Sequence, residues 1–168
     1  DDEHVYPYIT YDNVLVWKAL LALAHLYPAY HELEQTALNI RSAIERHCVK
    51  EKDGKPFYAW SVDLNGQYDI YDEPPGSLQI LPYLGFCRPD EDVYRNTVQM
   101  IRSSGYRYCF ASSRFAEIGC PHAPHPWILS VANSLLCGRT ASSAKFLHDV
   151  QMDHLIACES VDENTGEC

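Results

Sequence analysis

The sequence predicts an all-α fold built from pairs of helices, with one β-hairpin inserted. Apolar residues recur at helical spacing in two neighbouring segments, and the short connection at Pro28 predicts that they pack as an antiparallel helical hairpin. Farther along, Asn65-Gly66 separates two aromatic-rich segments, residues 57–62 and 67–71. Asn-Gly between two such segments is a strong signal for a β-hairpin.

The first helix is expected to begin at Asp12 and Asn13, whose side chains can cap its amino end, and to stop near Pro28. The second is expected to run from about His31 to Cys48, with its apolar residues on one face. Because the connection between them is short, these two helices lie side by side in the expected fold.

The later segments alternate between loops and helices. Residues 103–126 are rich in Ser, Gly and Pro, and long irregular segments within compact domains are usually functional. We therefore expect site residues there. The remaining elements are expected in this order: a charged loop at residues 50–55, a short helix that Ser77 caps and Pro82 ends, a helix over residues 90–101 with Val93, Val98, Met100 and Ile101 inward, and helices over residues 127–137 and 141–156 joined at Gly138.

Composition excludes several classes of partner. The 168 residues include 13 Lys and Arg against 23 Asp and Glu, a formal net charge of −10, and there is no basic run. Nucleic acid and anionic membrane partners are therefore not expected. The longest apolar stretch, interrupted by Lys18 and ending at His25, is much shorter than the ~20 residues that a transmembrane helix needs.

The cysteines and the two ends of the sequence bear on location and completeness. Seven cysteines without a C-x-x-C pair favour buried thiols in a reducing compartment over a disulfide framework. Because no signal-peptide pattern is visible, a cytoplasmic protein is expected. The sequence begins at Asp1 without Met and stops at Cys168 without a structural terminator, so we expect a chain that is truncated at both ends.

Three acidic pairs, at residues 1–2, 72–73 and 162–163, lie in loop-like stretches, and tyrosines adjoin the first two. Carboxylates among aromatic rings are typical of a carbohydrate site, where an acid and a base act on a C–O bond and rings stack on sugars. Each pair also has a plainer interpretation. The first could be a frayed end, the second the start of a Pro-Pro turn, and the third a solvated turn, which is the interpretation we favour for it.

Glu159 is a separate candidate. It follows the apolar segment 155–158, which we expect to end a helix, so its side chain is expected to point into an interior or a cleft. A partly buried Glu without an adjacent Lys or Arg would be suited to act as an acid or a base. Ser160 and Cys158 are not expected to be nucleophiles, because no G-x-S-x-G turn precedes Ser160 and no pairing His is evident.

A metal site is not expected at Cys120, His122 and His125. The intervening prolines exclude the helix that would bring these side chains onto one face. The histidines are expected instead to hydrogen-bond to the backbone or to a polar ligand.

Four segments resemble glycoside hydrolase family 125, the metal-independent exo-α-1,6-mannosidases. The most specific are Leu-Pro-Tyr-Leu-Gly at residues 81–85, after the acidic loop, and Gly-Cys-Pro-His at residues 119–122, followed by Trp127. Residues 1–8 resemble the family's Asp-Asp segment with spaced tyrosines, and residues 158–160 its Glu-Ser pair.

The resemblance implies that residues 1–168 form part of one catalytic domain, an α/α toroid of six helical hairpins, here carrying the β-hairpin. It implies hydrolysis of terminal α-linked sugars, mannosyl in the first place, from a glycan substrate, with inversion and without a metal or cofactor. The implied roles are general acid for Asp2, or else Asp1; general base for Glu159; and sugar contacts for Asp72, Glu73, His122, Trp127 and Tyr8.

The sequence differs from the family pattern at Glu73-Pro74-Pro75 and at Cys158, where a His is common. Two alternatives therefore stay open: a toroid glycosidase that acts on α-glucosides, and a non-catalytic carbohydrate-binding or scaffolding protein. Six helical hairpins need more residues than these. We accordingly expect exposed apolar helix faces, and weak or absent activity from this chain alone.

Overall fold

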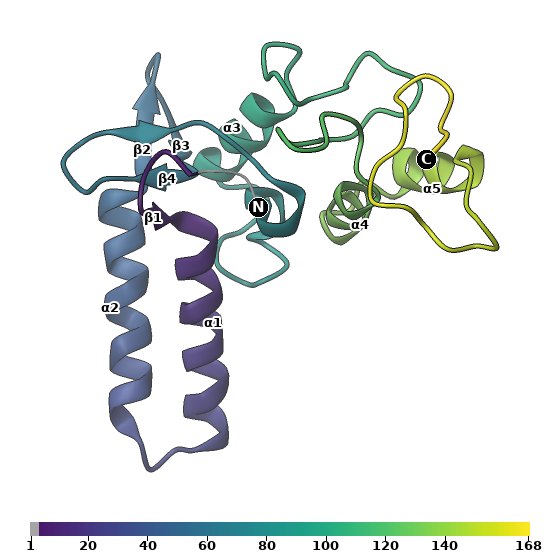
Figure 1. Ribbon diagram of the computed structural model, residues 1–168. Helices are drawn as coiled ribbons and strands as arrows, with labels where there is room; N and C mark the ends of the chain where they lie inside the picture. Colours follow the sequence, from purple (N-terminus) through teal and green to yellow (C-terminus); the bar gives the residue numbers. More distant parts are fainter. Residues whose placement is uncertain (1–3) are drawn as a thin grey trace. The chain divides into compact units, whose positions relative to one another are not determined.

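The structure, a computed structural model, describes residues 4–168 and divides into two compact units (Figure 1). We call the first the hairpin unit; it contains His4–Tyr71 and Leu81–Thr97. We call the second the loop unit; its described part contains Asp72–Ile80 and Val98–Cys168.

The hairpin unit is dominated by the predicted pair of antiparallel helices, α1 (Thr10–Leu26) and α2 (His31–His47) (Figure 1). On α2, residues such as Ile44 are buried on one face and polar residues face solvent, as its periodicity predicted. The start of α1 differs from the prediction. Because the helix begins at Thr10, Asn13 lies in its first turn, where its side-chain amide donates to the carbonyl of Ile9 at 2.7 Å.

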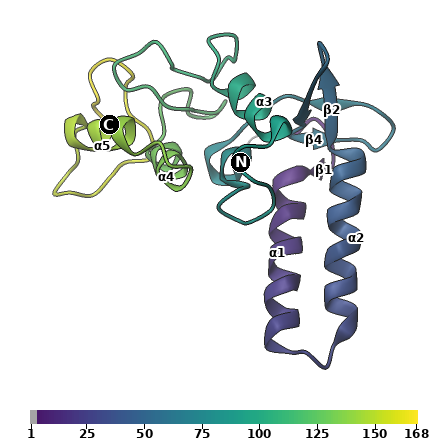
Figure 2. The ribbon, with the colours of Figure 1, turned by 180° about the vertical axis from the view of Figure 1, so that it is seen from behind.

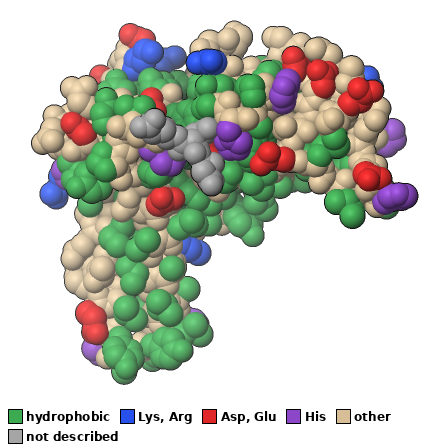
Figure 3. All heavy atoms as spheres, in the orientation of Figure 1, with side chains coloured by type: hydrophobic (Ala, Val, Ile, Leu, Met, Phe, Trp, Pro, Cys, Tyr) green, Lys and Arg blue, Asp and Glu red, His purple; other side chains and the backbone are tan. Residues whose placement is uncertain are grey.

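Helix α1 is apolar on nearly all of its faces. Val14 and Trp17 are buried against the rest of the hairpin unit. A helix that is hydrophobic all round normally has neighbours on every side, and in this structure part of it remains exposed, as expected (Figure 3). The large apolar residues exposed on the helix pair are Leu15, Val16, Leu23 and Leu26 on α1 and Leu38 on α2.

A two-stranded sheet replaces the charged loop that was expected after α2. Strands β2 (Val49–Lys52) and β3 (Lys55–Tyr58) pair antiparallel. Asp53 and Gly54 connect them with φ angles of 54° and 72°. Two successive positive φ angles match the twist of a tight hairpin, which explains Gly at the second position. The prediction of a loop here was wrong because the exposed charged side chains next to the turn, Glu51, Lys52 and Lys55, resemble those of a solvated loop.

The hairpin predicted around Asn65-Gly66 is confirmed, with shorter strands than expected. Strands β4 (Ser61–Val62) and β5 (Tyr68–Asp69) pair antiparallel, and β1 (Tyr8–Ile9) pairs with the other edge of β4. Figure 2 shows β1 and β4 from behind, near the end of the helix pair. The Asp63 carboxylate closes the turn by accepting hydrogen bonds from the backbone N–H groups of Asn65 and Gln67, at 2.7 and 2.9 Å.

Aromatic packing forms the core of the hairpin unit. The rings of Trp17 and Tyr58 meet that of Phe86 edge-on, at centroid distances of 5.2 and 5.9 Å. The guanidinium of Arg41 lies over Phe86, 4.8 Å from the ring centroid. Such contacts add to the hydrophobic gain of burying the rings.

Helix α3 (Asp92–Ile101) continues from the hairpin unit into the loop unit. Its start and end agree closely with the helix predicted over residues 90–101. The inward face is shifted from the one predicted. Tyr94, Thr97 and Ile101 are buried, and Val93, Val98 and Met100 are partly buried.

The loop unit has little regular structure. It contains two single 3₁₀ turns, η1 (Pro74–Gly76) and η2 (Leu78–Ile80), in place of the short helix predicted after Ser77. Two helices follow, α4 (Ile128–Leu136) and α5 (Thr140–Asp149). As expected, the stretch before α4 is irregular. The core of the unit contains Phe115, Val131, Phe146, Val150 and Val161.

The last helix ends seven residues earlier than predicted, at Asp149. The segment expected to continue it is an exposed loop, in which Leu155 and Ile156 are 90% and 72% exposed. His154 and Leu155 have positive φ angles, which no right-handed helix contains. The expectation that an apolar helix end directs Glu159 inward was therefore wrong.

The acidic pair at residues 162–163 lies in a turn, which is the interpretation that the sequence favoured. One carboxylate oxygen of Asp162 accepts hydrogen bonds from the backbone N–H groups of Asn164 and Thr165, at 2.9 and 2.8 Å. These bonds lower the pKa of the Asp162 carboxyl. Gly166 completes the turn with a φ angle of 78°.

The cysteines agree with the expectation of buried thiols only in part. Cys48, Cys87 and Cys120 are buried and form no disulfide. Cys158 and Cys168, however, form a disulfide with a Cα–Cα distance of 5.9 Å, contrary to that expectation. The bond closes the loop that contains Glu159. Within residues 4–168, no helix is long and apolar enough to cross a membrane.

Candidate functional site

The acidic loop of the loop unit is organised around Asp72. Its carboxylate is buried and accepts hydrogen bonds from the Ser77 hydroxyl and the Leu78 backbone N–H, both at 2.7 Å. Its backbone is fixed as well. The N–H of Asp72 donates to the Tyr106 hydroxyl oxygen at 2.8 Å, and its carbonyl accepts from that hydroxyl at 2.9 Å. Asp72 therefore holds the conformation of the loop that carries Glu73.

Burial raises the pKa of the Asp72 carboxyl to about 7. The hydrogen bonds from Ser77, Leu78 and Gln79 and the positive charge of Arg102 oppose this rise and are outweighed by it. The carboxyl group therefore changes its protonation state near neutral pH. The expected role of Asp72 as a direct sugar ligand stays a prediction. In the structure its carboxylate is hydrogen-bonded within its own loop.

A buried ion pair lies behind this loop. The Arg102 guanidinium donates to the Glu117 carboxylate at 2.7 Å, and both side chains are largely buried. The hydroxyls of Ser130 and Ser134 donate to the same carboxylate, at 2.8 and 2.7 Å. Both serines lie on α4, so the ion pair anchors the irregular segment to a helix. Hydrogen bonds of this kind are what a buried charge needs to be tolerated.

Gln79 connects the ion pair to Asp72. Its side-chain carbonyl accepts from Nε of Arg102, and its amide donates to the Ser77 hydroxyl at 3.0 Å. Ser77 in turn donates to Asp72. Sequence reasoning assigned no role to this chain of contacts. Glu117 lies two residues before the Gly-Cys-Pro-His segment, but nothing in a linear pattern pairs it with Arg102.

The second part of the site is the turn at residues 119–125. A Cβ atom on Gly119 would lie 2.3 Å from the carbonyl oxygen of His125, so only glycine fits at this position. The turn is closed by His125, whose backbone N–H donates to the Ala123 carbonyl at 2.8 Å. The indole N–H of Trp127 donates to the same carbonyl at 3.0 Å. The glycine and the indole together shape the turn that presents His122.

Two segments that are distant in the sequence run side by side at the end of this turn. Trp127 and Ser160 form an antiparallel bridge, next to hydrogen bonds from Ile128 N–H to the Glu159 carbonyl at 3.1 Å and from Val161 N–H to the Pro126 carbonyl at 2.9 Å. This pairing brings Glu159 close to the turn at residues 119–125.

Three predicted site residues meet here. Oε1 of Glu159 lies 4.0 Å from Nε2 of His122. The His122 ring meets the Trp127 ring edge-on, with centroids 5.1 Å apart. Trp127 is buried, whereas the side chains of His122 and Glu159 are 36% and 61% exposed. In this chain Glu159 is thus accessible to water, rather than partly buried as expected.

Glu73 completes this cluster. Its side chain is mostly buried, and a carboxylate oxygen, Sγ of Cys120 and a ring nitrogen of His122 all lie within 4.8 Å of one another. The sulfur of Cys120 is 3.4 Å from Nδ1 of His122. Glu73, Cys120, His122, Trp127 and Glu159 are therefore one group of neighbours, which we call the acidic cluster.

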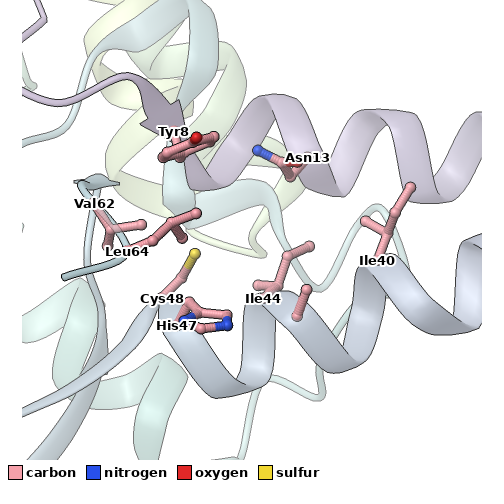
Figure 4. A pocket seen from close by; sticks show the side chains of 9 residues that line it. Tyr8, Asn13, Ile40, Ile44, His47, Cys48, Val62 and Leu64 are labelled. Carbon is pink, nitrogen blue, oxygen red and sulfur yellow. The ribbon is translucent and has the colours of Figure 1, made fainter. Parts of the chain in front are cut away.

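The other predicted site residues are not part of the acidic cluster as described. Asp1 and Asp2 lie outside the described residues. Tyr8 belongs to the hairpin unit, where it lines a cavity of about 240 Å³ together with residues of α1, α2 and β4, Ile44 and Val62 among them (Figure 4). Its predicted contact with a sugar stays a prediction.

Comparisons with known proteins identify relatives of this chain. The sequence profile of the metal-independent α-mannosidase family, GH125, matches residues 1–166. The Meiotically up-regulated gene 157 protein of Schizosaccharomyces pombe is 35% identical, over 73% of this chain and 26% of its own length.

A solved structure shows the same fold. It is a metal-independent α-mannosidase of Streptococcus pneumoniae in a non-productive complex with α-1,6-mannobiose. The match covers 99% of this chain and 43% of the pneumococcal chain, with a TM-score of 0.83 and 24% sequence identity. The chain thus spans less than half the length of either relative.

Proposed function

Because the chain belongs to glycoside hydrolase family 125, the metal-independent α-mannosidases, we propose that it contributes the catalytic base of a glycoside hydrolase. The proposed reaction is removal of terminal α-linked mannosyl residues from a glycan. One observation supports this most strongly: an exposed carboxylate, Glu159, is held beside His122 and Trp127 by backbone pairing between distant segments.

In the proposed mechanism, Glu159 takes a proton from a water molecule that attacks the anomeric carbon. Its exposure leaves room for that water, and His122 at 4.0 Å helps to hold the carboxylate in place. The general acid on the opposite side of the bond is Asp2 or Asp1. An inverting mechanism needs the two carboxyl groups roughly 6.5–9.5 Å apart, whereas a retaining pair is about 5–5.5 Å apart.

The neighbouring residues form the proposed sugar subsite. His122 offers an accessible imidazole that can hydrogen-bond to sugar hydroxyls, and Trp127 sets the orientation of that ring. Glu73 is positioned to accept a hydrogen bond from a hydroxyl, and Asp72 keeps its loop in shape. Tyr8 is a further proposed contact.

The proposed fold of the whole catalytic domain is the α/α toroid. The exposed apolar faces of α1 and α2 support this, because neighbouring helical hairpins would cover them. The bound disaccharide of the pneumococcal enzyme makes an α-1,6-linked mannoside the first substrate to test.

The test is turnover by the full-length protein of α-1,6-mannobiose and an aryl α-mannoside. A general base typically contributes about 10²–10⁴-fold. Glu159→Gln is expected to lower kcat by that factor, with little change in KM. Glu167→Gln, at another exposed position in the same loop, serves as the control.

Three outcomes would contradict parts of the proposal. Unchanged turnover by Glu159→Gln would eliminate this residue as the base. Faster hydrolysis of an aryl α-glucoside than of the mannoside would show that the preferred sugar is glucose and not mannose. Binding of mannobiose without any turnover by the wild-type protein would indicate a carbohydrate-binding protein.

A further inference from the structure

Three side chains of the acidic cluster are metal-ligand types of different chemistry. Glu73 precedes η1, and Cys120 and His122 lie in the turn at residues 119–125. A carboxylate, a thiol and an imidazole thereby converge from two separate segments. Sequence spacing indicated no metal site, because prolines prevent a helix around His122. The fold achieves the convergence in another way, by bringing Glu73 to the turn.

The distances suit a zinc ion. In a tetrahedral site with Zn–S of about 2.3 Å and Zn–N of about 2.0–2.1 Å, the sulfur and nitrogen ligands are about 3.5 Å apart. The sulfur of Cys120 lies 3.4 Å from Nδ1 of His122. All three donor atoms lie within 4.8 Å of one another, so the carboxylate of Glu73 needs only a small movement to complete three ligands.

The type of donor selects the ion. Thiolate and imidazole favour Zn²⁺ and similar soft or borderline ions, whereas Mg²⁺ and Ca²⁺ prefer sites built from oxygen. Cys120 and Glu73 are buried, and His122 is partly exposed. An ion can therefore reach the site from the side of His122, and a water molecule can occupy the fourth position.

We propose that Glu73, Cys120 and His122 form a Zn²⁺ site whose occupation inhibits the enzyme. Binding exchanges the thiol proton of Cys120 for a sulfur–zinc bond and releases that proton to solvent. The inhibitory part rests on the proposed function. Zinc at Nδ1 of His122 takes the lone pair of that nitrogen and leaves the ring proton on Nε2, which faces Oε1 of Glu159 at 4.0 Å. The zinc-bound imidazole therefore holds the Glu159 carboxylate as a hydrogen-bond acceptor and makes it a weaker base.

The binding test uses Co²⁺ as a spectroscopic probe in the full-length protein after treatment with a chelator. A thiolate-to-cobalt charge-transfer band and the visible bands of tetrahedral Co²⁺ are expected, and both disappear when Zn²⁺ is added. Cys120→Ser is expected to abolish the charge-transfer band and to weaken Zn²⁺ binding at least about 10-fold.

Two further variants make this test specific. Cys109→Ser removes a free, partly buried thiol outside the site and is expected to bind Zn²⁺ like the wild type. Glu73→Gln keeps the thiol and is expected to retain the charge-transfer band with weaker affinity. Absence of the band from the wild-type protein, or equal affinity of Cys120→Ser and Cys109→Ser, would overturn the site.

Inhibition is tested separately, on hydrolysis of the aryl α-mannoside. Zn²⁺ is expected to lower wild-type turnover, EDTA to restore it, and Cys120→Ser to keep turnover in the presence of Zn²⁺. Binding without inhibition would overturn the regulatory part alone. If the wild-type protein hydrolyses no glycoside, the proposed function fails, and the Co²⁺ spectrum still decides whether the site exists.

Discussion

The two units of this chain are stabilised in different ways. The hairpin unit buries aromatic and aliphatic side chains between helices and short strands, as Trp17 and Phe86 illustrate. The loop unit has an apolar cluster of its own, and it also buries Asp72, Glu117 and much of Arg102. Charges in an interior require partners in a defined geometry. The unit with less regular structure is therefore the one whose shape depends most on individual hydrogen bonds.

The largest effect is expected from removing one partner of the buried ion pair. Glu117→Ala leaves the Arg102 guanidinium buried without its carboxylate, which typically costs about 3–5 kcal/mol of stability. Denaturant unfolding measures the loss. Asp92→Ala, which removes the exposed ion pair with Arg95 in the hairpin unit, is the control and is expected to change stability very little. Equal effects of the two variants would contradict the contrast between the units.

Asp72 gives the loop unit a specific pH dependence. Its folded-state pKa of about 7 lies above the ordinary value of 3.8, so the folded protein binds a proton that the unfolded chain has released. This contribution favours folding at low pH and is lost as the pH rises from about 4 to about 7. Asp72→Asn does not titrate. The unfolding free energy of the wild type, relative to this variant, is expected to fall across that interval. A constant difference would contradict the raised pKa.

The backbone around position 119 leaves no room for a side chain larger than that of glycine. Gly119→Ala places a Cβ atom 2.3 Å from a backbone oxygen, and forcing such a contact typically costs about 1–3 kcal/mol. Because the displaced turn carries His122, KM for the mannoside is also expected to rise. Gly105→Ala is the matched control in the same unit, since its Cβ atom would meet only an ordinary contact at 3.6 Å. Thermal unfolding and steady-state kinetics distinguish the two variants.

The smallest effect is expected in the hairpin unit, at the turn between β2 and β3. Gly54→Ala meets no nearby atom, so its cost comes only from the positive φ angle and is about 1 kcal/mol. The turn is local, and substrate binding is expected to be unchanged. A rise in KM comparable to that of Gly119→Ala would show that the two units do not have the separate roles described here.

Much of the hairpin unit could be predicted from the sequence because its elements are local. Helical periodicity identified α1 and α2, and Asn65-Gly66 identified the turn between β4 and β5. The Asp53-Gly54 turn was missed, because the surrounding charges resemble a solvated loop. Local patterns thus predicted the helix pair and the Asn-Gly hairpin, and failed at the hairpin whose turn is surrounded by charges.

The candidate site could be predicted only in part. The resemblance to family 125 selected His122, Trp127 and Glu159, which the structure brings together. The exposure of Glu159 was not predicted. The apolar segment before it has the pattern of a helix end, whereas in the structure it forms a loop. The pairing of Arg102 with Glu117 was also beyond prediction, since contacts between distant residues leave no periodic signal.

The central claim is that Glu159 activates water directly and does not form a covalent intermediate. Proton NMR of the sugar released from an α-mannoside, recorded before mutarotation equilibrates the anomers, tests this claim directly. Attack by water on the face opposite the leaving group predicts that β-mannose appears first. If α-mannose appears first, the enzyme retains configuration, and Glu159 is not the base of an inverting hydrolase.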